Sequence, residues 1–225
     1  MQTQGNCLVT QQVSQFIEKY PYFSTIQEDD GSLALKGVLG FEGDFKGRII
    51  QDEFDLELRI PSTYPSEIPI VKEIGFRIPR DFHINLDDNS LCLAAPVAVK
   101  LIFSEEKTLL GFVDNLVVPF FYNFLHQQKY GSLIFGELSH GPEGVLEFYK
   151  HYFQEDENGT VVNLLKILAT DNYRGYSKCL CGSGKNLRNC HGRQLLRCML
   201  VQKTAEFRIE YFSILAFLSD TGKKG

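Results

Sequence analysis

The first third of the chain has one segment with helical periodicity and then four segments with the alternation of β-strands. Apolar residues recur at intervals of three and four from Leu8 to Tyr20, which predicts an amphipathic helix. Four runs rich in aromatic and β-branched residues follow, separated by glycine and proline: YFSTIQED, SLALKGVLGFEG, RIIQDEFDLELRIP and IPIVKEIGFRIP. The period of two is clearest from Phe54 to Ile60. We therefore expect a four-stranded antiparallel meander after the helix.

The remainder of the chain has mainly helical spacing. Residues 107–131 form a long apolar segment, in which Pro119 is expected to kink the helix or divide it, because proline has no N–H to donate. Residues 141–153 and 160–170 predict two further helices, and residues 193–219 predict another helical region. The order of elements predicts an α+β fold with helices packed on one side of an antiparallel sheet.

Composition and charge restrict the class of protein. The 225 residues are 44% hydrophobic and 23% charged, as in globular proteins, and the net charge is -5. This charge argues against a general binder of nucleic acid or of membrane surfaces. We find neither an 18-residue apolar stretch nor a signal peptide, so we expect a cytoplasmic protein whose six cysteines are thiols or metal ligands.

A change of composition near residue 171 predicts two domains, residues 1–170 and residues 171–225. The second contains CLCGSGKNLRNCH, in which four potential metal ligands fall within thirteen positions: Cys179, Cys181, Cys190 and His191. These ligands and the glycines between them suit tetrahedral zinc, and a closed four-ligand site makes the zinc structural. The pattern resembles the SEC-C motif, a small zinc-binding module. The GSGK run lacks the spacing of a phosphate-binding loop.

Two other features of the C-terminal region allow simple interpretations. Several basic residues surround the cysteines and form either a solvated face or a docking surface for a partner: Lys178, Lys185, Arg188, Arg193 and Arg197. Cys198 falls on the following helix and is expected in the core. Cys7, near the N-terminus, is expected to be incidental.

Cys92 stands within an ordered series of proline and polar positions. The series is Tyr64-Pro65, Ile68-Pro69, His83-Ile84-Asn85 and Leu91-Cys92-Leu93. Over residues 8–155 the chain thereby resembles the ubiquitin-conjugating (UBC-like) enzymes, whose fold is an N-terminal helix, a four-stranded meander and C-terminal helices. It departs from their pattern at Ile84, where the family has proline, and at Ala94, where it has aspartate. The asparagine-to-cysteine spacing is also one residue shorter, and no tryptophan follows, which places the chain among divergent bacterial members.

The resemblance implies a chemical role for each residue of this loop. Cys92 would carry the C-terminal carboxyl of a modifier protein as a thioester and pass it to an amine. Asn85 would stabilise the oxyanion or stiffen the loop, and His83 would fix the loop through hydrogen bonds. Carboxylates that could assist the amine are Asp87, Asp88 and Asp114.

Each of these residues also has a purely structural interpretation. Cys92 on its own would be a small buried hydrophobe. Asn85 is equally typical of an Asx turn, and the pair Asp87-Asp88 of a solvated turn. His83 is more typical of a structural histidine than of a general base.

The resemblance extends to partners. Bacterial proteins of this kind resemble components of antiphage (CBASS-like) operons, where the acceptor is a cyclic-oligonucleotide synthase, a cGAS-like nucleotidyltransferase. Because the chain has no nucleotide-binding glycine fingerprint, it would need a separate activating enzyme or an already reactive carboxyl. Two other functions stay open: a non-catalytic adaptor that binds protein partners, and a cysteine hydrolase that pairs Cys92 with His126 or His140.

Overall fold

The structure is a computed structural model that describes residues 2–134 and 141–221, with side chains from residue 8 onward. It divides into two compact units. Unit 1 comprises residues 1–93 and 102–136, and unit 2 comprises residues 94–101 and 137–225. This division differs from the expected boundary near residue 171.

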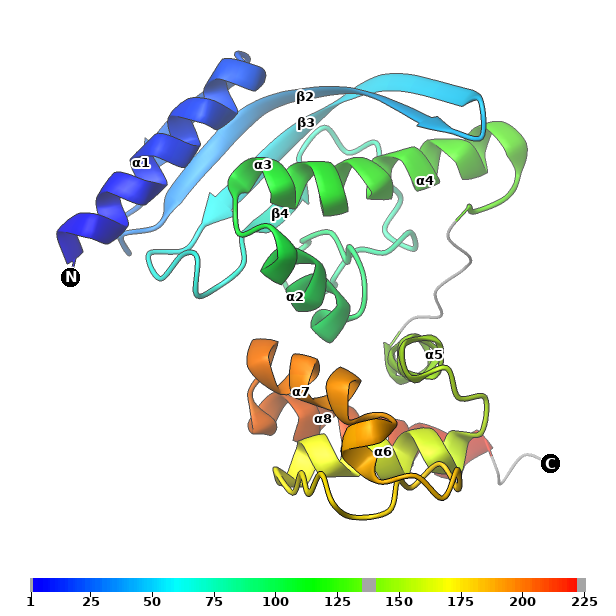
Figure 1. The fold of residues 1–225 in the computed structure, drawn as a ribbon. Helices are drawn as coiled ribbons and strands as arrows, with labels where there is room; N and C mark the ends of the chain where they lie inside the picture. Colours follow the sequence, from blue (N-terminus) through cyan, green and yellow to red (C-terminus); the bar gives the residue numbers. More distant parts are fainter. Residues whose placement is uncertain (1, 135–140, 222–225) are drawn as a thin grey trace. The chain divides into compact units, whose positions relative to one another are not determined.

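Unit 1 contains the predicted meander. Its first elements are α1 (Gln2–Lys19), β1 (Phe23–Gln27), β2 (Leu33–Phe45), β3 (Arg48–Ile60) and β4 (Ile70–Glu73). The four strands form one antiparallel sheet in the order β1-β2-β3-β4 (Figure 1). The fold is therefore α+β, with the predicted N-terminal helix and four-stranded sheet.

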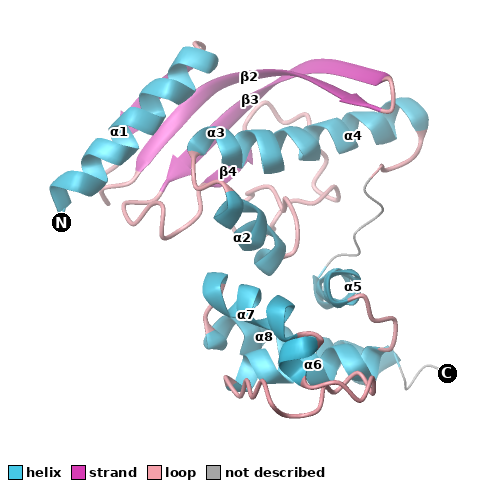
Figure 2. Ribbon diagram, in the orientation of Figure 1, coloured by secondary structure: helices cyan, strands magenta, loops and turns pink. Residues whose placement is uncertain are grey.

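The alternation of apolar residues determines which face of the sheet is buried. In β3, Phe54, Leu56, Leu58 and Ile60 are all buried, while the residues between them are more exposed. Phe54 stacks on Phe121 from a helix that lies along the sheet, with ring centroids 4.1 Å apart (Figure 2). Burying a side chain of this size contributes about 1.5–3 kcal/mol. The inward face of β3 is thus the core of unit 1.

The long apolar segment is helical without interruption around Pro119. It consists of α3 (Leu109–Phe112), the π-helix η1 (Val113–Val117) and α4 (Val118–Tyr130). Pro119 lies in the first turn of α4 and donates no backbone hydrogen bond, and the wider π-helical turn before it accommodates this loss. Among the described residues this is the one helix long and apolar enough to cross a membrane, and most of it is buried, as in a core helix.

Unit 2 is helical. It contains α5 (Gly141–Phe153), α6 (Asn158–Thr170), the 3-10 turn η2 (Leu187–Asn189), α7 (Gly192–Val201) and α8 (Thr204–Thr221). The predicted helices over 141–153 and 160–170 are confirmed, and the region 193–219 is two helices. One further helix was not predicted, α2 (Pro96–Glu105), whose Val97 and Leu101 belong to the core of unit 2.

A single core explains why unit 2 begins well before residue 171. Leu146 and Phe153 of α5 and Leu164 of α6 pack in one cluster with Cys179 and with Phe207 of α8. The cysteine-rich segment therefore does not form a separate domain. It shares its apolar contacts with the two helices that precede it.

Candidate functional site

A short antiparallel pairing shapes the loop of Cys92. Ile84 pairs with Leu91, and two backbone hydrogen bonds flank this pair: Cys92 N to His83 O (2.7 Å) and Asn85 N to Ser90 O (2.8 Å). In this register His83 lies opposite Cys92 and Asn85 lies opposite Ser90 along the backbone.

The Cys92 loop is attached to the sheet. The N–H of Leu91 donates to the carbonyl of Val71 in β4 at 2.8 Å, and the Leu91 side chain is buried. His83 and Asn89 both have positive φ, 45° and 58°, which allows the chain to turn sharply at either side of the paired residues. Backbone hydrogen bonds therefore join Cys92 to His83 and Asn85 to Ser90 within one loop, and the catalytic grouping of these side chains stays a prediction.

The side-chain amide of Asn85 takes part in a hydrogen-bond series within the loop. Its Nδ2 donates to Ser90 Oγ at 2.9 Å, and Ser90 Oγ donates to Asp88 Oδ1 at 2.7 Å. The backbone N–H of Ser90 donates to the same Asp88 oxygen at 2.9 Å. Sequence reasoning missed Ser90, because no motif marks it, although it is the buried residue of the three.

Cys92 is half-buried. Desolvation by burial raises the pKa of its thiol, so at neutral pH the thiol form is favoured more strongly than in an exposed cysteine. The sulfur is accordingly less ionised at rest than an activated nucleophile.

The structure gives the candidate carboxylates different surroundings. Asp114 binds Lys19 through both oxygens at 2.8 Å and accepts from Tyr20, so it joins η1 to α1. Partial burial would raise the pKa of Asp88, but the hydrogen bonds from Ser90 outweigh it and lower that pKa. Asp87 lies exposed in the loop.

The hydrolase hypothesis can be examined at His126, whose two ring nitrogens are bound by groups other than Cys92. His126 is buried, and its two ring nitrogens lie 2.6 Å from Ser132 O and 2.8 Å from Arg48. Since a carbonyl only accepts, Nδ1 carries the proton and Nε2 accepts from Arg48. His140 and the side chain of Cys7 lie outside the described residues.

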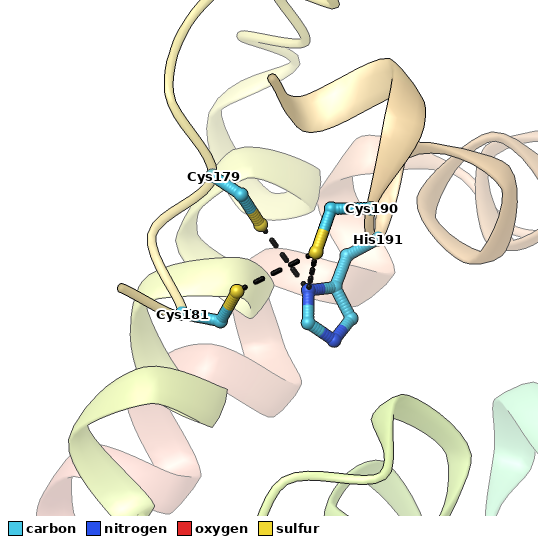
Figure 3. Close-up of side chains that lie close together, drawn as sticks. All are labelled: Cys179, Cys181, Cys190 and His191. Carbon is cyan, nitrogen blue, oxygen red and sulfur yellow. Dashed lines mark hydrogen bonds between the residues drawn. The ribbon is translucent and has the colours of Figure 1, made fainter. Parts of the chain in front are cut away.

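The second candidate site is the cluster of Cys179, Cys181, Cys190 and His191. Figure 3 shows the three sulfurs and the imidazole pointing to a common centre. Their ligand atoms all lie within 4.8 Å of one another. Cys179 Sγ and Cys190 Sγ lie 3.2 and 3.5 Å from His191 Nδ1, and Cys181 Sγ lies 3.5 Å from Cys190 Sγ. Tetrahedral zinc requires separations of about 3.5–3.8 Å between ligand atoms, so the cluster could hold a metal ion with little adjustment.

A hydrogen bond outside the cluster orients the imidazole. His191 Nε2 lies 3.0 Å from the carbonyl oxygen of Phe153 at the end of α5, and therefore donates to it. This leaves Nδ1 unprotonated and facing the sulfurs, which is the form that binds a metal. Burial raises the pKa of Cys179 to about 11, so its deprotonation is favourable only with a cation nearby.

A small hairpin and a helix start bring the four ligands together. Lys178 pairs with Asn186, and Gly182 and Gly184 adopt positive φ of 75° and 72° in the turn between them. This turn carries Cys179 and Cys181, while Cys190 and His191 directly precede α7. The glycines noted in the sequence are thus required by the backbone conformation.

The predicted core cysteine and basic residues have the surroundings expected of them. Cys198 is fully buried on α7. The basic residues near the cluster are all exposed: Lys178, Lys185, Arg188, Arg193 and Arg197. Their exposure agrees with a solvated face and equally with a docking surface, so both interpretations stand.

Comparisons of the chain with protein-family models, with curated proteins and with solved structures found no match in any of the three. The function must therefore be argued from the two sites themselves.

Proposed function

We propose that the protein is a ubiquitin-conjugating-like acyl transferase that carries a modifier on Cys92. The supporting observation is the paired loop, in which the Cys92 N–H binds the His83 carbonyl, Asn85 pairs with Ser90, and the Leu91 N–H binds Val71 of β4. The order of helix, meander, cysteine loop and helices agrees with the UBC-like fold that the sequence resembles.

The proposed reaction has two steps, each an exchange at one carbonyl carbon. First, the Cys92 sulfur attacks an activated modifier carboxyl, a new S–C bond forms, and the donor's leaving group departs with the thiol proton. Second, an acceptor amine attacks the thioester, an amide bond forms, the S–C bond breaks and the amine proton returns to sulfur. No histidine base beside the sulfur is required, because the first step exchanges one leaving group for another of similar acidity.

Asn85 is the group that would stabilise the negative oxygen formed in the second step. An amide has two N–H donors, and Ser90 holds one of them. In other acyl-transfer sites one such donor contributes about 2.7–4 kcal/mol. We assign His83 to positioning, because its carbonyl accepts the Cys92 N–H.

We propose that the metal site of unit 2 binds zinc and is structural. Three thiolates and one imidazole nitrogen saturate a tetrahedral ion and leave no position for a substrate. The residues that would hold it are Cys179, Cys181, Cys190 and His191.

The biological setting is proposed from the resemblance. The acceptor would be a cyclic-oligonucleotide synthase in antiphage defence in the bacterial cytoplasm, and a separate activating enzyme would supply the modifier. The net charge of -5 fits a protein acceptor better than nucleic acid, which is itself negatively charged.

A peptide with a C-terminal α-thioester tests the first step without an activating enzyme. Wild-type protein is incubated with this donor, and intact mass is measured before and after addition of excess thiol. We expect one added acyl group that thiol removes and that maps to Cys92. Cys92→Ser should lack it, and the matched variant Cys7→Ser should retain it.

A failure of Cys92 to take up the acyl group, under conditions in which free cysteine is acylated, would contradict the proposal. It would favour the adaptor function, in which the fold binds partners without chemistry.

A further inference from the structure

We propose that Ser90 is a positioning residue for acyl transfer: it holds the amide of Asn85, and Asp88 sets the direction of its hydroxyl. This inference rests on the proposed function of Cys92. It adds Ser90, which neither the motif nor the resemblance assigns, and it gives Asp88 a different role from the assistance to the amine considered above.

The direction of each hydrogen bond follows from the groups involved. An ionised carboxylate only accepts, so the Ser90 hydroxyl must donate its single proton to Asp88 Oδ1, 2.7 Å away. The Ser90 oxygen then presents a lone pair to Asn85, whose Nδ2 lies 2.9 Å away. The amide hydrogen and the hydroxyl hydrogen therefore point the same way along the series, toward the carboxylate.

Burial makes this arrangement specific. Ser90 is only 6% exposed, so its hydroxyl cannot exchange freely among water partners. Asp88 is also fixed, because the backbone N–H of Ser90 donates to the same oxygen. A series of bonds that ends on a charge polarises the donors along it.

The position of Ser90 connects this series with the sulfur. Ser90 and Cys92 are two residues apart in one of the two paired segments. Backbone hydrogen bonds join them to Asn85 and His83 in the other segment. With one N–H of Asn85 held by Ser90, the rotation of the amide is restrained and its second N–H is fixed within the loop that carries Cys92. The role we assign to Asp88 is to orient the serine through Oδ1, which accepts from both the hydroxyl and the backbone N–H of Ser90.

The test separates loading of Cys92 from discharge. Wild-type protein and variants are loaded with the peptide α-thioester, freed of excess donor and mixed with free lysine over a range of pH. Ser90→Ala should load within about twofold of wild type but discharge about tenfold more slowly, because a misplaced donor affects the amine step. Ser90→Thr, which keeps the hydroxyl, should restore discharge.

Two further variants complete the design. Asp88→Ala removes the acceptor of the Ser90 hydroxyl and should slow discharge about as much as Ser90→Ala. It tests the same hydrogen-bond series in case Ser90→Ala does not fold. Leu86→Ala, in the same loop and 79% exposed, should behave as wild type.

The outcomes are distinguishable. If wild type loads and Ser90→Ala discharges at the wild-type rate, the inference is wrong and the proposed function stands. Equal loss of loading and discharge in Ser90→Ala and Ser90→Thr would mark a merely structural role and also overturn it. If wild type does not load at all, both proposals fail.

Discussion

Removal from water shifts the pKa of several side chains in this protein, Cys92 and Glu210 among them. The Cys92 thiol is half-buried, and Glu210 of α8 is 9% exposed, where it accepts a hydrogen bond from Tyr149 at 2.6 Å. In both groups desolvation raises the pKa, because burial disfavours the charged form. Two measurements follow at this scale.

Cys92 should react slowly with an alkylating agent at neutral pH. Because its pKa is raised above the usual value of 9.0, the rate should still be climbing above pH 9. The measurement is the rate of iodoacetamide labelling at Cys92 against pH, followed by mass spectrometry. A plateau below pH 8 would contradict the expected shift.

Glu210 should make the protein less stable as pH rises. The pKa of Glu210 in the folded state lies above the ordinary 4.5, so the native state holds this proton more tightly than the unfolded state does. The bound proton therefore stabilises the fold at low pH, and this stabilisation is lost as pH rises through the folded-state pKa. Glu210→Gln should therefore gain stability relative to wild type at neutral pH, by about 1.4 kcal/mol for each unit of raised pKa.

The control for this effect is Glu206, one turn earlier in α8. Partial burial would raise the pKa of Glu206, but its bond to Lys100 and nearby contacts lower it, so Glu206→Gln should lose stability at neutral pH. Urea unfolding of both variants and wild type from pH 4.5 to 8 gives the comparison. If the free energy of unfolding depends on pH in the same way in all three proteins, the assigned directions of the two pKa shifts are wrong.

At the scale of elements, one buried amide joins three parts of unit 1. Gln12 of α1 accepts from the Tyr64 hydroxyl at 2.5 Å and from the Leu109 N–H of α3 at 3.0 Å. Gln12→Ala leaves the Leu109 N–H without this acceptor and the Tyr64 hydroxyl with only the carbonyl of Lys107, 3.4 Å away, which should lower the free energy of unfolding by about 1–3 kcal/mol. The exposed neighbour Gln11 provides the matched variant Gln11→Ala, which should change the free energy of unfolding by less than about 0.5 kcal/mol. Denaturant unfolding measures both.

The elements that the sequence predicts well are those with a clear period. Alternation identified β3, and three- and four-residue spacing identified α5 and α6. The helix α2 was missed because its short apolar run does not distinguish a helix from a buried strand. The contact between Gln12 and Leu109 joins residues 97 positions apart, and no local pattern encodes it.

The candidate sites were predictable to different degrees for the same reason. Ligands such as Cys179 and His191 are close in sequence, and their spacing alone indicated a metal site. Ser90 and its bonds within the loop depend on backbone pairing that the sequence does not display. The boundary at residue 171 followed a change in composition, whereas domains are defined by shared packing.

At the scale of the whole molecule, the metal site and the core of unit 2 depend on one another. Removing the metal with a chelator should selectively destabilise unit 2, since bound zinc at about 1,000 times its dissociation constant contributes about 4 kcal/mol. Differential scanning calorimetry with and without chelator should show a lower transition temperature for this unit. Loading of Cys92 by the peptide thioester should change little, and a parallel loss of loading would contradict the assignment of a structural role.

The division into units predicts how fragments behave. Residues 171–225 alone should not fold cooperatively even with zinc, because their partners Leu146, Phe153 and Leu164 are missing. Residues 137–225, which retain these three partners and no part of unit 1, should give a cooperative thermal transition by circular dichroism. A cooperative transition in the shorter fragment would restore the boundary at residue 171.

The His191 ring, which faces the sulfurs through one nitrogen and the Phe153 carbonyl through the other, has a consequence for biosynthesis. The last turn of α5 leaves the ribosome 38 residues before the side chain that completes it. Under the proposed zinc assignment, the Phe153 carbonyl gains its His191 donor only after the later segment has emerged and bound the ion. Cellular zinc supply at the moment of translation would thus set the yield of mature protein, and not only its later durability.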